Sequence, residues 1–380
     1  MDPYRILFPL GVAFAIGGSA LWLLHAAGAI PYPASLHWHL MTQGFQHCFI
    51  LGFLLTAMPS FMSSERCRPW ELGVAAAGMV GFGAATLLGL GAAAQAFYVA
   101  TIFLVAAMAA RRLVAGAKAP PEEFLLAALG LLFGAVGGVW MGGVELGWLG
   151  EPLPRFALRL VSMGMILSLV LGVGGLLVPT FSSMREPLRI PGVAAPHQRR
   201  PRRILYAAVA LALAASFYLE AGGHAVAGAW LRAATGSTVL LLVWKLLRLP
   251  GRQDLLSFTL WGAGWMILMG LWLVAILPAR PLLGAHVVLV GGFGFLSAGI
   301  ATRVVVRHGG HALPEEAKVL RPAVVLLLAL AVTARAAAEA AGASPRPALL
   351  GASAAAWILA WIVWGLGAAP RLATSSRRGS

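Results

Sequence analysis

The sequence predicts an all-α integral membrane protein with twelve transmembrane helices. Of the 380 residues, 60% are hydrophobic and only 11% are charged, whereas soluble domains keep about a quarter of their residues charged. The apolar stretches are each about 20 residues long, which suits a hydrocarbon core of roughly 30 Å. They lack the polar–apolar alternation of membrane β-barrel strands. A single polytopic membrane domain over residues 1–380 is therefore expected.

Each apolar stretch is predicted to form one transmembrane helix. In chain order the stretches are Tyr4–Gly28, Leu36–Pro59, Trp70–Gly91, Ala93–Gly116, Glu122–Gly143, Arg155–Phe181, Ile204–Gly222, Ala225–Leu247, Leu255–Leu277, Leu282–Val306, Ala323–Ala341 and Ala348–Gly367. The only long internal connection is a basic loop at 182–203, and a second basic segment at 371–380 forms the tail.

Positive charge is distributed unevenly between the loops. Of the 28 Lys and Arg residues, 22 fall in the N-terminus, in alternate loops and in the C-terminal tail. The positive-inside rule therefore predicts that both termini are cytoplasmic, in agreement with an even number of spans. Because the net charge of +15 follows this loop pattern, it indicates contact with the lipid bilayer and not with nucleic acid.

An internal repeat is predicted from two similar segments. LGFLLTAMPSFMSS (Leu51–Ser64) and LGVGGLLVPTFSSM (Leu171–Met184) match without gaps at a Gly, a Pro, a Phe and a Ser. The extended alignment, carried more loosely to the tenth stretch, places Gly44 with Gly164 and Gly291, Gly52 with Gly172 and Gly299, and His39 with Arg159 and His286. The matched stretches are four apart, which favours three parallel four-helix repeats. The alternative is chance, because Gly and Leu are common in this chain.

The second stretch contains the densest cluster of potential metal ligands. Its LHWHLMTQGFQHC segment holds His37, His39, Met41 and His47. Imidazole is the usual ligand of haem iron, and imidazole and thioether also bind copper. For His37 and His39 the alternative is a cap on polar loops at the membrane surface. His47 is either a ligand or a hydrogen-bonded packing residue.

The tenth stretch adds a histidine at a similar depth. His286 lies about one turn below the outer surface, as His39 does if the second and tenth stretches run in the same direction. A bis-histidine haem site needs two imidazoles from different helices. We therefore predict that His39 and His286 face each other across an internal cavity and bind haem iron. Gln43 is the nearest candidate to hold these imidazoles in place.

Arginines in the outer part of the spans are candidates for binding anionic groups. Arg159 and Arg335 are predicted to bind haem propionates or an anionic substrate if they face an interior site. Arg335 and Glu339 are one helical turn apart and are expected to pair. The sequence has no CxxCH, which argues against covalent c-type haem, and no P-loop, GxGxxG or HExxH motif.

These features together resemble the NnrS family of bacterial inner-membrane proteins. The resemblance rests on twelve-span hydropathy and on three segments: YRILFPLGV, LHWHLMTQGF followed by LGFLLTAMPSF, and GAHVVLVGGFGFLSAGIATRVVVRHGGH. The positions that fit the family pattern are His37, His39, Met41, His286, Thr302, Arg303, Val304 and His308. Leu40 stands where many members have Glu, and Arg307 stands where Gly usually precedes the His.

The resemblance implies a cofactor and a biological setting. Family members are described as containing haem, here expected as non-covalent b-type haem, and copper. They are linked to denitrification, nitric oxide metabolism and protection against nitrosative stress. The resemblance supplies no defined reaction or electron donor. At the level of fold, twelve helices with histidines in the second and tenth look like the low-spin haem half of the haem–copper oxidase core, an analogy of limited weight.

Three functions are consistent with the sequence. The first is a haem-binding membrane protein, with or without bound copper, that acts on nitric oxide or a related small molecule. The second is a transporter or channel in which buried His and Arg form a proton or anion path without a redox cofactor. The third is an accessory factor for another membrane enzyme. An optical spectrum of the purified protein separates the first from the other two.

Overall fold

Twelve long apolar helices make up the structure, as the sequence predicts. The structure is a computed structural model, and it describes residues 2–150, 153–182, 196–342 and 344–373. Within these ranges every regular element is a helix. Twelve helices are long and apolar enough to cross a membrane. The sixth span, Arg155–Phe181, coincides with the predicted one, and most others differ from prediction by a few residues at their ends.

The contacts group the chain into two compact units. Unit 1 comprises Met1–Pro3 and Leu54–Arg248, and unit 2 comprises Tyr4–Phe53 and Leu249–Ser380. The boundary falls inside α3 (His47–Phe61), and the prediction that both units act as a single domain stays a prediction.

Unit 1 holds spans three to eight. Its elements are α4 (Pro69–Leu87), α5 (Gly91–Val114), α6 (Phe124–Glu145), α7 (Leu153–Arg159), η2 (Leu160–Met165), α8 (Ile166–Phe181), α9 (Pro196–Ala221), α10 (Ala225–Thr238) and η3 (Val239–Val243). The predicted basic loop at 182–203 is shorter than expected, because α9 already begins at Pro196. Arginine favours helix nearly as well as leucine, so the helix continues into charged sequence. Residues 183–195 lie outside the described residues.

Unit 2 holds the first span, the outer part of the second, and spans nine to twelve. Its elements are α1 (Tyr4–Ala26), α2 (Ala34–Trp38), η1 (His39–Gln46), the start of α3, α11 (Leu255–Ile276), α12 (Pro281–His286), η4 (Val287–Phe293), α13 (Gly294–His308), η5 (Leu313–Glu315), α14 (Glu316–Val319), α15 (Pro322–Ala340) and α16 (Arg346–Ala373). The last helix extends beyond the predicted Gly367, so the predicted tail at 371–380 begins in helix. Residues 374–380 lie outside the described residues.

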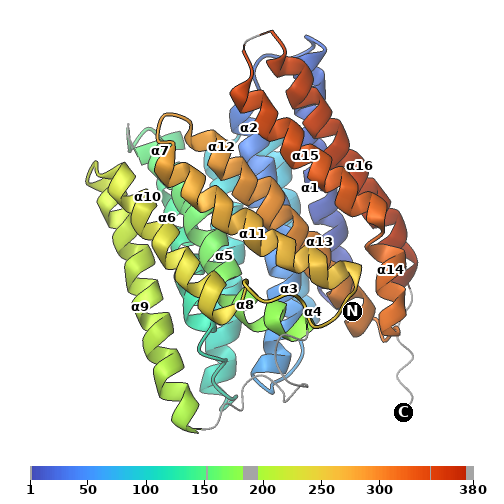
Figure 1. Cartoon of the computed structure of the whole chain (residues 1–380). Helices are drawn as coiled ribbons and strands as arrows, with labels where there is room; N and C mark the ends of the chain where they lie inside the picture. The colour runs from blue at the N-terminus through green and yellow to red at the C-terminus, as the bar shows by residue number, and fades with distance from the viewer. Residues whose placement is uncertain (1, 151–152, 183–195, 343, 374–380) are drawn as a thin grey trace. The chain divides into compact units, whose positions relative to one another are not determined.

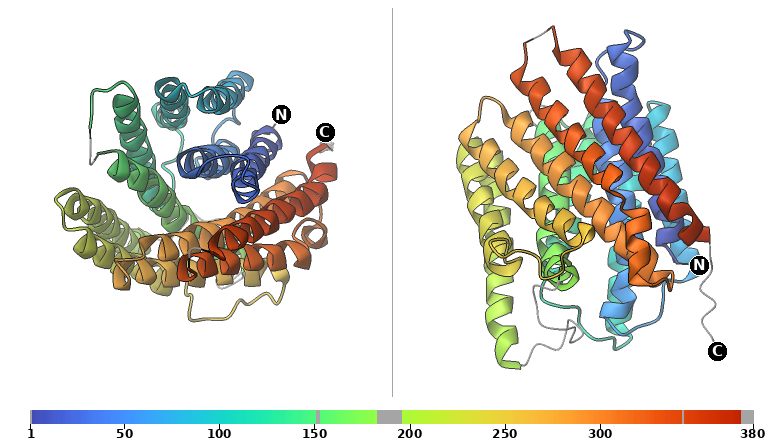
Figure 2. Two further views of the ribbon diagram at one scale, coloured as in Figure 1. Left: turned by 90° about the horizontal axis from the view of Figure 1, so that it is seen from above. Right: turned by 45° about the vertical axis from the view of Figure 1, so that its right-hand side comes forward.

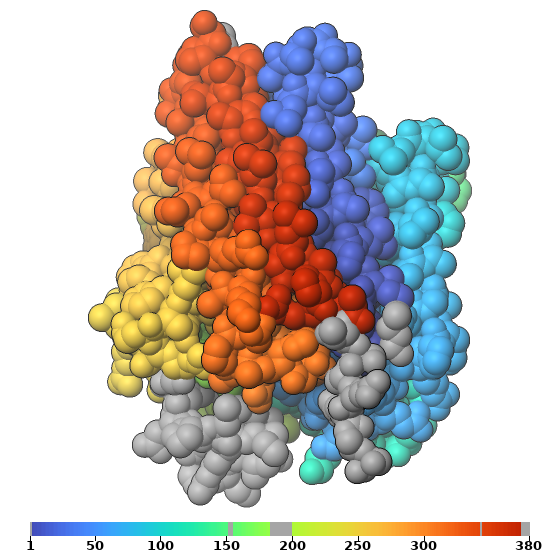
Figure 3. Space-filling view, turned by 90° about the vertical axis from the view of Figure 1, so that its right-hand side faces the viewer, coloured from blue at the N-terminus to red at the C-terminus, as the bar shows by residue number. Residues whose placement is uncertain are grey.

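The helices of unit 2 bury an aromatic core and expose apolar surface. α15 and α16 run side by side in opposite directions, and α16 also packs on α1 (Figures 1 and 2). Phe45 contacts Trp357 and Trp361 of α16 through ring edges, at centroid distances of 5.6 and 4.9 Å. The outer surfaces of α15 and α16 are drawn in orange-red and red in Figure 3, and the exposed leucines of these helices include Leu326 and Leu366. Apolar residues outside as well as inside are what a lipid-embedded bundle requires.

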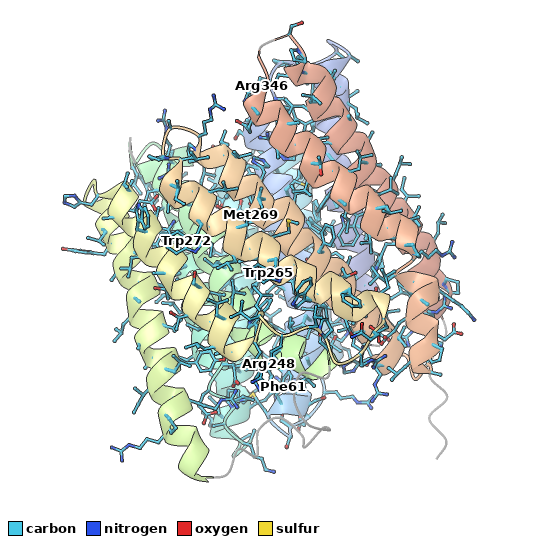
Figure 4. All side chains as sticks on the ribbon, in the orientation of Figure 1. Phe61, Arg248, Trp265, Met269, Trp272 and Arg346 are labelled. Carbon is cyan, nitrogen blue, oxygen red and sulfur yellow. The ribbon has the colours of Figure 1, made fainter. Side chains whose placement is uncertain are left out.

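The ninth span shows the same division between faces. Trp265, Met269 and Trp272 of α11 lie along one side of the helix (Figure 4), and Met269 is 46% exposed. The other side of α11 packs against α12 and η4. There Gly270 and Gly284 bring two backbones together, because a side chain at either position would meet backbone atoms of the other helix.

The second, sixth and tenth spans share a departure from α-helical geometry. Each begins with a short α-helix and passes through a π-helical segment, η1, η2 or η4, before a longer α-helix. A fourth π segment, η3, lies in the eighth span. The segment η1 begins at His39, and the other two begin one residue after the aligned Arg159 and His286. π-Helical turns are uncommon and concentrate at functional sites.

The aligned glycines of these spans also occupy similar surroundings. Gly44, Gly164 and Gly291 each face a large apolar side chain of the preceding span, respectively Phe14, Phe133 and Met266. Likewise Gly52, Gly172 and Gly299 face Phe8, Leu126 and Leu260. The three-fold repeat stays a prediction, and these similarities agree with it.

Candidate functional site

Two histidines of unit 2 have similar hydrogen-bond arrangements. His37 lies on α2, and its Nδ1 is 2.8 Å from the carbonyl oxygen of Gly18 on α1. His286 ends α12, and its Nδ1 is 2.8 Å from the carbonyl oxygen of Leu282, one turn earlier. A carbonyl only accepts hydrogen bonds, so Nδ1 must carry the proton in both rings. The Nε2 atom of each neutral imidazole then presents its lone pair, as a metal-ligating histidine requires.

The same two histidines interact with each other and with one arginine. The Arg335 guanidinium of α15 lies close enough for its charge to act on both imidazoles, and His37 also acts on His286. Both rings are half-buried, whereas Arg335 is 8% exposed. The structure thus brings together His37 from the second span, His286 from the tenth and Arg335 from the eleventh.

Arg335 is held in place by the acidic residue that the sequence indicates. Its Nη1 donates to Glu339 Oε1 at 2.6 Å, which confirms the predicted pairing across one helical turn. Arg346, at the start of α16 (Figure 4), lies 3.3 Å from the same carboxylate oxygen. A guanidinium has five N–H donors, and within the described residues only one atom of Arg335 makes a hydrogen bond. Donors therefore remain for a carboxylate or another anion beside the imidazoles.

His39 has different neighbours. Its Nδ1 lies 2.8 Å from Gln43 Oε1, so Gln43 orients this imidazole as expected. Its ring also stacks edge-on against Trp38 at 5.0 Å. A pairing of His39 with His286 stays a prediction, and His37 is a further histidine of the second span that lies near His286.

The remaining metal candidates of the second span are more dispersed. The sulfur of Met41 accepts a long contact of 3.8 Å from the Ser19 hydroxyl. His47 and Cys48 are fully buried at the start of α3. Across the described part of the chain, no three or more His, Cys, Asp or Glu side chains gather in a group able to hold a metal ion. A pair of imidazole ligands is smaller than such a group.

Arg159 belongs to an ion cluster in unit 1. It lies 2.5 Å from Glu220 Oε1, and the buried Arg232 lies 2.7 Å from Glu220 Oε2. Arg232 also contacts Ser216 Oγ at 3.3 Å and covers the ring of Phe217 at 4.0 Å. A role for Arg159 in binding a cofactor stays a prediction. The sequence does not reveal this cluster, because its members come from three separate helices.

The far end of the tenth span carries the remaining polar residues of the resemblance. Trp364 donates to Thr302 Oγ1 at 2.9 Å, and Arg303 pairs with Glu316 at 2.5 Å. The ring of His308 lies 6.3 Å from that of Tyr4. These residues lie near both chain ends, since Arg5 donates to the carbonyl of Leu372. The termini of the described chain are thus on the same side, as an even number of spans requires.

Comparison with known proteins agrees with the sequence and the fold. A search of curated proteins finds no match. The family model described as NnrS protein matches residues 1–376. That match includes the second and tenth spans and the Thr302–Arg303 pair. The chain therefore belongs to the NnrS family.

Proposed function

We propose that this protein binds a non-covalent haem between His37 and His286 and acts in nitric oxide metabolism or in tolerance of nitrosative stress. The observation that carries the proposal is the pair of imidazoles from two helices, each with Nδ1 engaged by a backbone carbonyl. Iron held by two imidazoles supplies one-electron redox chemistry when bound. His37 and His286 orient that group, and their carbonyl partners fix the tautomer.

The charge of Arg335 favours haem over a bare metal ion at this pair. A cation next to a buried guanidinium is repelled, because screening is weak away from water. Haem carries two carboxylates, and charge-assisted hydrogen bonds from an arginine are among the strongest that a protein makes. The unused donors of Arg335 therefore fit a propionate. Copper, if bound, would use other ligands, for which Met41, His39 and His47 are the candidates.

The setting follows from the family and the fold. Membership of the NnrS family supports a place in the bacterial cytoplasmic membrane, and the arginine-rich alternate loops support cytoplasmic termini. The lipid bilayer is then the main partner, and nitric oxide or a related small molecule is the expected ligand. Nitric oxide is small and uncharged, so it reaches a half-buried site without a charged entrance.

The test is an optical spectrum with haem and metal analysis of the purified protein. We expect a haem-to-protein ratio near one, falling at least about tenfold in His37→Ala and in His286→Ala. His308→Ala, at the other end of the tenth span, is the control and should keep its haem. Added imidazole should restore a two-imidazole spectrum to either alanine variant. Full haem retention in both variants would overturn the site, and a colourless wild-type protein would overturn the function.

His39 provides the sharpest comparison within this experiment. If His37 is the ligand, His39→Ala should retain most of its haem, because His39 would then not bind the iron. The reverse pattern, with haem lost from His39→Ala and kept in His37→Ala, would assign the iron to His39. The alternative function, a transporter without a redox cofactor, predicts no chromophore in any variant.

A further inference from the structure

Buried hydrogen-bonding side chains continue from the imidazole pair toward the opposite end of unit 2. They come mainly from the second and tenth spans, and most are less than 10% exposed. In order from the imidazole end they are His39, Gln43, Gln46, His47, Ser297, Thr302, Arg303 and Glu316. A polar group at membrane depth is costly without a partner, and intramembrane polar residues usually mark pathways. We name this set the polar column.

The middle of the polar column joins the two spans directly. The Ser297 hydroxyl of α13 donates to Gln46 Oε1 at the end of η1, at 3.3 Å. Gln46 is followed by His47, which is fully buried. Hydrogen bonds of this kind stabilise pairs of membrane helices only weakly. Stabilisation of the helix pair alone therefore does not explain the presence of a glutamine, a histidine and a serine at this depth.

The outer part of the polar column ends at His39, two residues after His37. Gln43 is fully buried and bonds His39 at 2.8 Å. Gln43 and Gln46 are three residues apart, and both lie in the π-helical segment η1. The residues from His286 to Thr302 rise roughly 24 Å at 1.5 Å per residue, so the column covers most of a hydrocarbon core of about 30 Å.

The inner end of the polar column is an ion pair between the tenth span and α14. Glu316 begins α14 and pairs with Arg303, the residue after Thr302. Both are buried, with 6% and 8% exposure. Burial raises the pKa of Glu316, and the charge of Arg303 offsets this only in part. A carboxyl of this kind gains and loses a proton closer to neutral pH than a free glutamate does.

We propose that the polar column conducts protons between Glu316 and the His37–His286 pair. The inference rests on the proposed function, because a proton is needed there only if a redox group is bound. One electron from a one-electron donor adds one negative charge in a poorly screened site, and one proton arriving through the column balances it. Between Ser297 and Thr302 the helix rises about 7.5 Å, a gap that water molecules bridge in a proton relay.

The experiment uses the haem-loaded protein in sealed, anaerobic vesicles of bilayer lipid. A pH-sensitive dye is trapped inside one sample and added outside another. Orientation is read from protease access to a C-terminal tag, because Arg371 in the last turn of α16 pairs with Glu315, next to Glu316. Reduced methyl viologen, a one-electron donor that carries no proton, reduces the haem. We expect alkalinisation of the compartment that faces Glu316, approaching one proton per electron.

Two substitutions test the route, and one matched serine controls for side effects. Gln46→Leu should slow proton uptake at least about tenfold with haem content unchanged, and Ser297→Ala should slow it by a smaller factor. Ser353→Ala also removes a buried hydroxyl of unit 2, but that hydroxyl bonds Ala331 O at 2.8 Å outside the column. It should leave the rate unchanged. If Gln46→Leu does not fold, Ser297→Ala against Ser353→Ala carries the test.

The outcomes separate this proposal from the proposed function. A sample without haem would overturn the proposed function and, with it, the need for protons. Haem that is reduced normally while protons enter from the compartment facing His286 would overturn the column alone. Equal rates in wild type, Gln46→Leu and Ser297→Ala would overturn it as well.

Discussion

The contact between α11 and α12 predicts that two glycine-to-alanine substitutions destabilise the protein. A Cβ atom at Gly284 would lie 2.6 Å from both the carbonyl oxygen of Gly270 and the backbone nitrogen of Val274. At Gly270 it would lie 2.7 Å from the carbonyl oxygen of Gly284. Backbone atoms cannot rotate away as side chains do. The helices must therefore separate by about 0.8 Å before the 2.6 Å contacts of a Cβ at Gly284 lengthen to an ordinary 3.4 Å.

Two opposing effects decide the size of the change. Alanine favours helix over glycine by about 1 kcal/mol. Overpacking costs typically 1–3 kcal/mol, and contact with backbone on the facing helix places Gly284→Ala near the upper end. We expect a net loss of about 2 kcal/mol in the free energy of unfolding. The Gly270→Ala and Gly284→Ala losses should not add, because one separation of the helices relieves both contacts.

A glycine elsewhere on the same helix supplies the control. A Cβ at Gly262 of α11 would meet nothing within 4 Å. Gly262→Ala should therefore leave stability unchanged or raise it by up to about 1 kcal/mol. Thermal unfolding in detergent measures all three variants. Wild-type stability in Gly284→Ala, or an equal loss in Gly262→Ala, would refute the packing argument.

The same substitution has a consequence for the proposed site. Gly284 precedes His286 by two residues, so moving α12 away from α11 displaces the imidazole. Metal–nitrogen bonds are about 2 Å long and tolerate little displacement. We expect weaker haem retention in Gly284→Ala, and unchanged retention in Gly262→Ala.

Two further predictions concern the thiols and the topology. Burial, with a contribution from Glu71, raises the pKa of Cys67 to about 11, whereas a free cysteine has a pKa near 8.5. In a Cys48→Ala background, maleimide labelling of Cys67 at pH 8 should be on the order of 100-fold slower than that of a free cysteine. The labelling rate should rise about tenfold per pH unit up to pH 10, because only the thiolate reacts. Labelling as fast as that of a free thiol would contradict the raised pKa. Reporter tags at Ser380 and within 185–203 should both report the cytoplasm, because the arginine asymmetry is large. A periplasmic signal from either tag would contradict the span count or the orientation.

The spans were predictable because their signal is local. Length and hydropathy are properties of about 20 consecutive residues, and all twelve spans are found. The Arg335–Glu339 pair was predictable for the same reason, since residues four apart share a helix face. The hydrogen bond from His37 to Gly18 was not, because it joins two helices and uses a backbone carbonyl that every residue possesses.

The faces of the second span could not be predicted from helical periodicity. At 100° per residue, His39, Gln43 and His47 share one face of an α-helix. Residues His39–Gln46 instead form a π-helical segment, whose hydrogen bonds reach one residue further and whose turns are wider. Such a turn depends on the packing of neighbouring helices, so helical periodicity alone does not give the face on which each histidine of the second span lies.

Each unit contains a glutamate that pairs with two arginines. Glu220 of unit 1 accepts from buried Arg232 and from Arg159, whose side chain is 48% exposed. Glu339 of unit 2 accepts from buried Arg335 and from Arg346, whose side chain is 41% exposed.

The two glutamate–arginine clusters differ in where the second arginine comes from. This difference follows from the residue at the aligned position of the sixth and tenth spans. Where that residue is Arg159, it supplies the second arginine of the cluster, and the carboxylate of Glu220 is shared between two charges. Where that residue is His286, the second arginine of the cluster is Arg346 of α16. The imidazole of His286 then lies near Arg335 and His37. A histidine placed at 159 would therefore leave Glu220 with Arg232 as its one arginine. On this reasoning the proposed haem site belongs to unit 2, where His37 and His286 lie near Arg335, whose charge is balanced by Glu339.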